Sequence, residues 1–73
     1  MREFILDSEH IELVKLLKLL RIAETGGHAK MMVEAGEVLL NGKPEFRKRA
    51  KLRANDEVEV MGIKIGIKFS AKD

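Results

Sequence analysis

Apolar positions are closely spaced from Ile11 to Leu20, and the pattern predicts a helix. Three polar residues at a spacing of three interrupt these positions, and they are Glu12, Lys15 and Lys18. That spacing gathers them into one narrow stripe, so the helix should be apolar around most of its circumference and largely buried. Asp7 and Ser8 precede it and suit an N-cap, because their side-chain oxygens can accept bonds from free first-turn amides. We therefore expect a central helix that begins just after Ser8 and ends near Leu20.

A second, shorter helix is predicted over residues 26–35. Thr25 is a suitable N-cap, and apolar residues recur at helical spacing at Ala29, Met32 and Val33. Gly36 stands where a left-handed residue commonly ends a helix. A helix of about ten residues is marginal in isolation, so tertiary contacts must hold it in place.

After the second helix the spacing of apolar residues falls to two, which is typical of strands. Val38 and Leu40 lead to Asn41-Gly42, a strong sequence for a tight hairpin turn. Alternation across residues 57–69, with Gly62 permitting a turn, predicts a second hairpin with one aliphatic face.

The order of these elements indicates the fold class. Residues 3–6 are apolar enough for a short N-terminal edge strand. We expect an α+β fold in which two packed helices are followed by a small, mostly antiparallel sheet, with residues 1–73 forming a single domain.

Composition narrows the range of functions. The chain has 73 residues and no cysteine, and its histidines are His10 and His28, without metal-ligand spacing around them. We therefore expect no catalytic residue, metal, cofactor or small-molecule substrate. The longest aliphatic or aromatic runs are three residues, against about 20 apolar residues for a membrane span. A cytoplasmic, monomeric binding protein without a membrane partner is the resulting expectation.

Charge is concentrated in one part of the chain. The totals are 14 basic and 12 acidic residues, but residues 43–53 hold six bases and one acid. That segment therefore carries +5 while the remainder carries −3, and its bases are Lys43, Arg47, Lys48, Arg49, Lys51 and Arg53. A local cluster of this kind favours phosphate binding. A solvated loop is the alternative.

The start of the second helix is the other candidate for phosphate binding. A helix N-terminus presents unpaired amides and the positive end of its dipole. Gly26 and Gly27 cost helix propensity, about 1 kcal/mol each relative to alanine, but they leave the backbone open to a ligand, and Lys30 could add a charged contact. Alternatively, the glycines only ease the turn between the helices while Lys30 pairs with Glu34.

Taken in order, these motifs resemble the αL RNA-binding module. This family was first described in ribosomal protein S-four and is shared with pseudouridine synthases, tyrosyl-tRNA synthetases and a heat-shock ribosome-rescue protein. The resemblance rests on Thr25-Gly26-Gly27-His28-Ala29-Lys30, Gly36-Glu37-Val38, Asn41-Gly42, Glu45, Arg47-Lys48-Arg49, Lys51-Leu52 and Asp56. Within the family the chain is similar to the stand-alone YbcJ-like or YaaA-like subgroup, which is tied to ribosome association or maturation.

The resemblance implies that the second helix and the following hairpin form one surface for structured RNA, chiefly ribosomal RNA. The predicted RNA-binding residues are Thr25, Gly26, Gly27, His28, Lys30, Lys43, Arg47, Lys48, Arg49 and Lys51. The chain departs from the family pattern at His28, where many members have arginine, and at Asn55, where glycine is common. Because asparagine tolerates left-handed geometry, the turn at Asn55 should survive.

Three alternatives remain open at this point. Phe46 lies inside the basic segment and could stack on a base, although a lone phenylalanine beside a loop more often anchors that loop to the core. Two short helices joined at a glycine-containing turn also suit a DNA-binding helix-turn-helix. A protein-interaction module is the third possibility.

Overall fold

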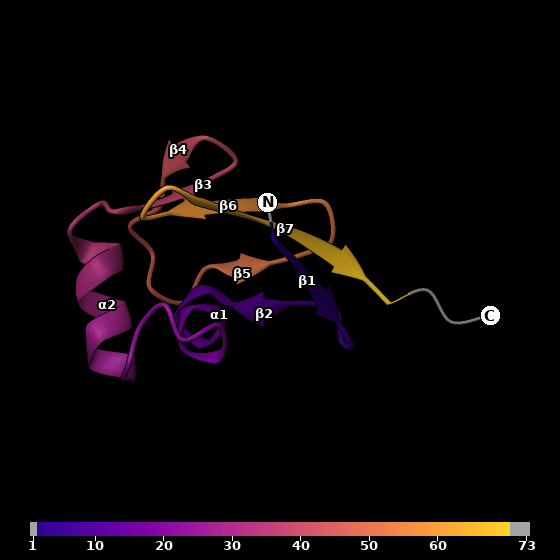
Figure 1. Ribbon diagram of the computed structural model, residues 1–73, viewed down its shortest axis with the longest axis horizontal. Helices are drawn as coiled ribbons and strands as arrows, with labels where there is room; N and C mark the ends of the chain where they lie inside the picture. Colours follow the sequence, from indigo (N-terminus) through magenta and orange to yellow (C-terminus); the bar gives the residue numbers. More distant parts are fainter. Residues whose placement is uncertain (1, 71–73) are drawn as a thin grey trace.

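A computed structural model of the protein describes residues 2–70. The helices and strands, in chain order, are β1 (Arg2–Leu6), β2 (Ile11–Glu12), α1 (Leu13–Leu19), α2 (Gly26–Glu34), β3 (Val38–Leu40), β4 (Lys43–Pro44), β5 (Lys51–Leu52), β6 (Glu57–Val60) and β7 (Ile63–Phe69). The larger sheet has α1 beneath it and α2 at one end (Figure 1), and the two helices pack against each other. The expected α+β fold is confirmed.

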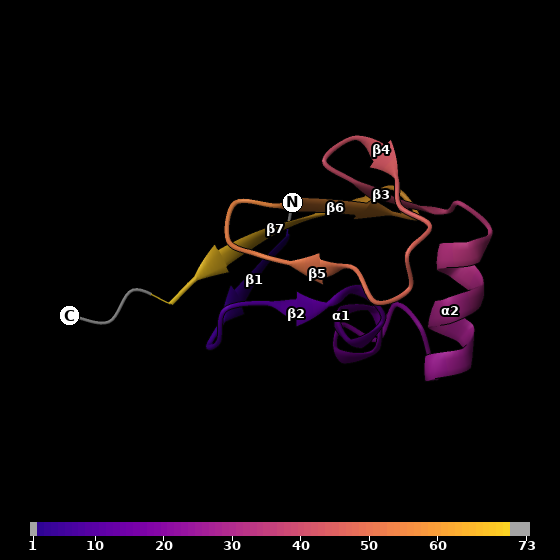
Figure 2. The ribbon, with the colours of Figure 1, turned by 180° about the vertical axis from the view of Figure 1, so that it is seen from behind.

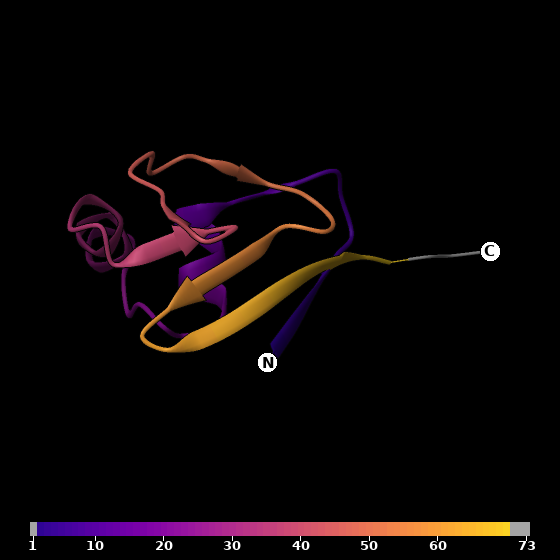
Figure 3. The same ribbon diagram turned by 90° about the horizontal axis from the view of Figure 1, so that it is seen from above.

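The larger sheet has the strand order β1-β7-β6-β3-β4. Its pairings are antiparallel except that β1 lies parallel to β7, with Phe4 beside Ile67. The N-terminal edge strand and the mostly antiparallel sheet are therefore as predicted. A second sheet of two strands, β2 and β5, was not predicted, and it lies on the helix side of the larger sheet (Figures 1 and 3).

The first helix starts later than the sequence pattern predicted. Ile11 pairs with Leu52 in the small sheet, so α1 begins only at Leu13, and the cap expected at Asp7 and Ser8 is wrong. Ser8 instead donates its hydroxyl to the carbonyl of His10 at 3.0 Å. A partner strand about forty residues further along the chain overrides the local helical pattern.

The burial of α1 is also narrower than expected. Leu13, Leu16 and Leu17 are fully buried, but Leu19 is 55 % exposed. The helix ends in a Schellman motif, in which the amide of Ile22 donates to the carbonyl of Leu17. Only seven residues are helical, so Ile11 and Leu20, at the two ends of the predicted helix, lie outside it.

The second helix and the hairpin turns follow the prediction. Thr25 caps α2, and Gly36 ends it in a left-handed conformation with φ of 75°. The turns at 41–42 and 61–62 both have positive φ at each central residue, as a two-residue hairpin turn of type I′ requires. Asn55 has φ of 78°, so the turn there survives without glycine, as expected.

The core lies between the larger sheet and α1. The largest fully buried side chains are Leu6, Leu13, Leu16, Leu17, Val33, Val38, Leu52, Val58, Val60, Ile65 and Ile67. No helix in residues 2–70 has the length and apolar character needed to cross a membrane. In the same part of the chain, no three acidic, histidine or cysteine side chains come together in a way that could hold a metal ion.

Candidate nucleic-acid interface

The middle of the basic segment, residues 45–50, forms an anchored loop between β4 and β5 (Figure 2). At its start the amide of Glu45 donates to the carbonyl of Val38 at 2.9 Å, and at its end the amide of Leu13 donates to the carbonyl of Ala50 at 2.9 Å. Val38, Leu13 and Ala50 are buried. Both ends of the loop are thus tied to the core, so the cations between them have defined positions.

Three of the six cations pair with carboxylates of the protein itself. Lys48 Nζ lies 2.7 Å from Glu34 Oε2, and Arg49 Nη2 lies 3.5 Å from Glu12 Oε2. The third pair is Arg47 with Glu45, at 3.0 Å between Nε and Oε2. The loop is therefore joined to α2 and to β2 by side chains as well as by its backbone.

The ion pair of Glu34 with Lys48 bears on whether Lys30 pairs with Glu34. Hydrogen bonding and charge from Lys48 lower the pKa of Glu34 below its ordinary value, with a smaller contribution from the charge of Lys30. Within residues 2–70 the ion-pair partner of Glu34 is Lys48. The alternative in which Lys30 pairs with Glu34 is therefore not what the structure shows, and the Lys30 ammonium stays available to a ligand.

Basic side chains gather around one shallow hollow of about 450 Å³. We call it the basic depression, and its lining residues are Arg47, Arg49, Ala50, Lys51 and Arg53. Arg47 and Arg49 come from a turn in which the amide of Ala50 donates to the carbonyl of Arg47 at 3.2 Å, while Lys51 lies in β5 and Arg53 follows it. Arg53 was counted in the basic segment but not among the predicted binding residues. Conversely, Lys43 in β4 and Lys48 are not part of the lining.

The N-terminus of α2 has the geometry of an open anion site. The hydroxyl of Thr25 accepts from the amide of His28 at 3.0 Å, and His28 Nδ1 accepts from the amide of Glu24 at 3.2 Å. A Cβ added at Gly26 or Gly27 would meet its nearest neighbour at 3.9 Å, an ordinary contact, and both residues are helical. Neither glycine is therefore required by packing or by backbone conformation.

The two candidate surfaces are joined along α1 rather than along α2. Lys48 contacts Glu34 at the C-terminal end of α2, opposite the end that holds Gly26. A hollow of about 420 Å³ instead runs beside α1, and its lining residues are Glu12, Val14, Lys15, Lys18, Leu19 and Gly26. Glu12 in that lining also contacts Arg49 of the basic depression.

Lys15 and Lys18 therefore lie between the basic depression and the helix start. Sequence reasoning treated them only as the polar stripe of a buried helix. Their spacing was visible in the sequence, but their position beside Gly26 depends on how the helices pack.

Phe46 contacts the protein with one edge of its ring. Its ring lies against Gly36, where an added Cβ would meet ring carbons at 3.2 and 3.4 Å. The residue is nevertheless 60 % exposed. One edge of the ring thus fixes the loop to the end of α2, while the rest faces solvent.

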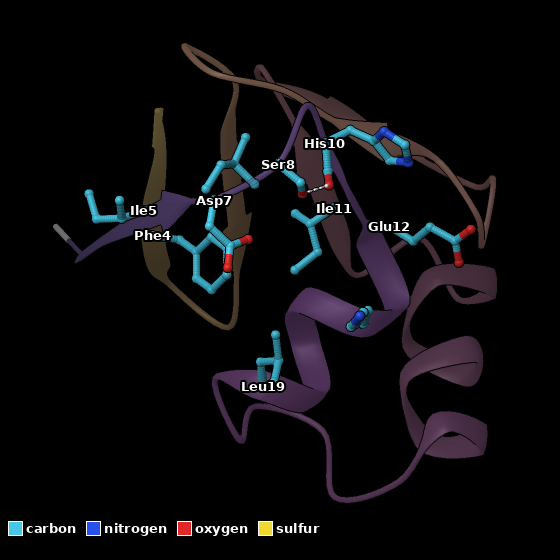
Figure 4. A pocket seen from close by; sticks show the side chains of 10 residues that line it. Phe4, Ile5, Asp7, Ser8, His10, Ile11, Glu12 and Leu19 are labelled. Carbon is cyan, nitrogen blue, oxygen red and sulfur yellow. Dashed lines mark hydrogen bonds between the residues drawn. The ribbon is translucent and has the colours of Figure 1, made fainter. Parts of the chain in front are cut away.

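A larger hollow of about 550 Å³ lies between β1 and α1 (Figure 4). Its lining mixes apolar residues with Asp7, Glu12, Lys15 and other polar residues. Figure 4 shows the His10 ring pointing away from the Asp7 carboxylate. Acids and bases both line this hollow, whereas four bases and Ala50 line the basic depression. The basic depression and the helix start are therefore the candidate nucleic-acid interface.

Comparison with known proteins gives a consistent set of relatives. Residues 4–68 match the S4 domain family. The chain is 40% identical over 57 residues to a Bacillus subtilis (strain 168) protein named "Probable ribosome maturation protein RlbA", a match that spans 78% of this chain and 80% of the relative. It is 42% identical over 53 residues to the Escherichia coli (strain K12) protein named "Putative RNA-binding protein YbcJ", spanning 73% of this chain and 76% of the relative.

A solved structure extends this likeness to the fold. The solution structure of YbcJ from E. coli is described as revealing an αL motif involved in RNA binding, and it superposes on this chain with a TM-score of 0.70 at 36% identity. The superposition covers 93% of this chain and 87% of YbcJ. The resemblance identified from the sequence motifs is confirmed.

Proposed function

The chain belongs to the S4 domain family, and on that premise we propose that it is a non-catalytic protein that binds the phosphate backbone of structured RNA. The name of the B. subtilis relative, a probable ribosome maturation protein, supports ribosomal RNA as the RNA, and that of YbcJ supports RNA binding. The observation that carries the proposal is the basic depression, because four cations line one hollow formed by a loop anchored to the core at both ends and by the strand that follows it. We further propose that the protein acts as a single copy in the cytoplasm.

Phosphates can enter the interface at little cost to the protein. The pairs of Lys48 with Glu34 and of Arg49 with Glu12 lie between side chains that are at least one-third exposed, and such pairs are worth about 0–1 kcal/mol. A phosphate oxygen can therefore replace the carboxylate as partner. Lys51 and Arg53 have no ion-pair partner within residues 2–70, so they can bind phosphate directly.

The start of α2 supplies the second half of the proposed contact. Thr25 already satisfies the amide of His28, which leaves the amides of Gly26 and Gly27 as first-turn donors. Since neither glycine is required for packing, their lack of side chains supports a role in letting an RNA backbone approach. Backbone contacts of this kind set position and orientation rather than sequence preference.

Binding of a structured ribosomal RNA fragment over a range of salt concentrations tests the proposal. With about five phosphate contacts, log K should fall against log salt with a slope of about −3 to −5. Combining Lys51→Gln with Arg53→Gln should reduce the magnitude of that slope by about 1.4–1.8. Lys64→Gln with Lys68→Gln is the matched control, because it removes the same charge from exposed positions of β7, and it should leave the slope unchanged.

Other results would favour the alternative functions. Equal effects of the two double variants would mean that the basic depression is not the RNA site. Tighter binding to duplex DNA than to RNA at matched salt would favour the helix-turn-helix interpretation. Association with partner proteins that survives RNase treatment would indicate a protein-interaction module.

A further inference from the structure

Glu45 is the only acid in the basic segment, and it accepts three hydrogen bonds from one residue, Arg47. Its Oε2 accepts from the amide of Arg47 at 3.0 Å and from Nε of the same residue at 3.0 Å, while Oε1 accepts from Nη2 at 3.1 Å. The Glu45 side chain is 13% exposed, whereas that of Arg47 is 77% exposed. A largely buried carboxylate thus accepts two hydrogen bonds from one edge of an exposed guanidinium.

The other two ion pairs of the loop are made differently. Lys48 and Glu34 meet at a single contact, and so do Arg49 and Glu12. A single contact between two long exposed side chains restrains neither of them strongly. Two parallel hydrogen bonds to one carboxylate, by contrast, fix both the position and the plane of a guanidinium.

Glu45 is also fixed relative to the protein core. Its amide donates to the carbonyl of Val38 in β3, and Val38 is fully buried. The Arg47 guanidinium is therefore connected to the sheet through hydrogen bonds at both the backbone and the side chain of Glu45. Arg47 is held in this way at the edge of the basic depression.

The two hydrogen bonds to Glu45 leave the other edge of the Arg47 guanidinium free. A guanidinium carries five N–H donors, and Glu45 engages the one on Nε and one of the two on Nη2. Both hydrogens of Nη1 and the second of Nη2 remain. One hydrogen of Nη1 and the free hydrogen of Nη2 point in parallel, and this pair is the fork that matches two oxygens of a phosphate.

We propose that Glu45 is a positioning residue for RNA binding: it orients Arg47 so that the free edge of the guanidinium meets a backbone phosphate. The inference rests on the proposed function and concerns a residue that touches no RNA. It leads to a counter-intuitive expectation, because an acid inside a phosphate-binding surface should repel RNA. Repulsion at an exposed surface is weakened by salt and water, whereas ordering of Arg47 before binding lowers the entropy lost on binding.

Neutralisation of Glu45 distinguishes charge repulsion from orientation of Arg47, because loss of repulsion would strengthen RNA binding and loss of orientation would weaken it. At about 0.15 M salt, Glu45→Gln should weaken RNA binding about three- to tenfold, because the guanidinium loses its fixed orientation. Glu34→Gln is the matched control, since it removes the same charge from a carboxylate that contacts the same loop. It should leave binding unchanged or strengthen it. Thermal unfolding of each variant checks that the fold is retained.

The Arg47→Gln background shows whether Glu45 acts through the Arg47 side chain. In that background Glu45→Gln should no longer weaken binding, because no guanidinium is left to orient. If Glu45 only stabilised the loop through the Arg47 amide, its loss would weaken binding in both backgrounds. That result would overturn the positioning role, as would tighter binding by Glu45→Gln alone.

The same measurements keep the two proposals apart. If the unmutated protein binds RNA and Arg47→Gln weakens it while Glu45→Gln does not, only the positioning role is lost. If the unmutated protein does not bind structured RNA, the proposed function fails and the positioning role fails with it. Arg47→Lys gives a further check, because lysine cannot form the two-point grip and should also bind RNA more weakly.

Discussion

Asn41 has two roles, of which only one was evident from the sequence. Its φ of 52° provides the left-handed first position of the turn, as Asn41-Gly42 predicts. Its side chain also donates from Nδ2 to Asp56 at 3.1 Å and accepts from the amide of Glu57 at 2.8 Å. Asp56 in turn accepts from the amide of Arg53 at 2.8 Å. Asn41 therefore joins the hairpin turn to the end of the basic segment.

Asn41→Gly should separate these roles. Glycine adopts the positive φ freely, so the turn should persist while both side-chain hydrogen bonds are lost. We expect the free energy of unfolding to fall by about 1–2 kcal/mol, measured by urea denaturation. Met61→Gly in the other hairpin is the matched control, because Met61 has φ of 54° and is 71% exposed. Equal destabilisation by the two substitutions would contradict a structural role for the Asn41 side chain.

Gly36 is required both by its backbone and by its neighbour. Its φ is 75°, and an added Cβ would meet Phe46 at 3.2 Å. Gly36→Ala should therefore cost about 1–2 kcal/mol for the left-handed backbone and should also displace the Phe46 ring. Gly42→Ala is the control, because Gly42 has φ of 87° and open space around it. Urea denaturation should show a larger loss for Gly36→Ala, and Phe46→Ala should remove the difference between the two.

At the scale of elements, the sequence predicted what depends on neighbours in the chain. Thr25 and Gly36 mark the ends of α2, and Asn41-Gly42 marks a turn, because each acts on groups within a few residues. The start of α1 depends on Ile11 pairing with Leu52, a contact that no local pattern contains. Similarly, Arg21 ends α1 with φ of 60°, although glycine is the residue that usually marks such a position.

In the first turn of α2, Gly26 and Gly27 are expected to lower the stability of the fold and to favour RNA binding. Gly26→Ala and Gly27→Ala should each raise the free energy of unfolding by about 0.5–1 kcal/mol, since both sites are helical and have room for a methyl group. The same substitutions should weaken RNA binding, because the methyl groups hinder approach to the first-turn amides. Met31→Ala, at an exposed position of the same helix, should leave RNA binding unchanged. Unaltered binding by both glycine variants would mean that the glycines serve only the turn.

At the scale of the whole molecule, three acids pair with cations of the basic loop: Glu12 in β2, Glu34 in α2 and Glu45 in the loop itself. Hydrogen bonds from Arg47 lower the pKa of Glu45, and Lys48 lowers that of Glu34, from the ordinary value of 4.5. A carboxyl whose pKa is lower in the folded state stabilises the fold above the unfolded pKa and loses this contribution as the pH falls through the folded pKa.

The free energy of unfolding at low salt should therefore contain a contribution from these two acids that is complete above pH 4.5 and disappears below it. Urea denaturation across pH 3–7 measures this dependence. The variant combining Glu34→Gln with Glu45→Gln should lose stability less steeply with acid than the unmutated protein. Parallel pH profiles for the two proteins would contradict the assignment.

The packing of the helices also decides how far the interface extends. The basic segment was visible as a charge cluster in the sequence, but Lys15 and Lys18 belong to a helix that seemed buried. They line the hollow that reaches from Gly26 to Glu12, the partner of Arg49. Which surface residues connect the two candidate sites could therefore not be predicted before α1 and α2 were placed.

Lys15 and Lys18 should contribute to RNA affinity if the backbone follows this hollow from the helix start to the basic depression. Each phosphate contact accounts for a slope of about 0.7–0.9 in log K against log salt. Lys15→Gln with Lys18→Gln should thus reduce the magnitude of the slope by about 1.4–1.8, as measured by fluorescence anisotropy. Lys64→Gln with Lys68→Gln removes equal charge from β7 and should have no such effect. At physiological salt, electrostatic interactions between exposed charges are screened beyond about 8 Å, so Lys15 and Lys18 affect the slope only if RNA phosphates come close to them. An unchanged slope for the α1 variant would therefore mean that RNA reaches the basic depression by another path.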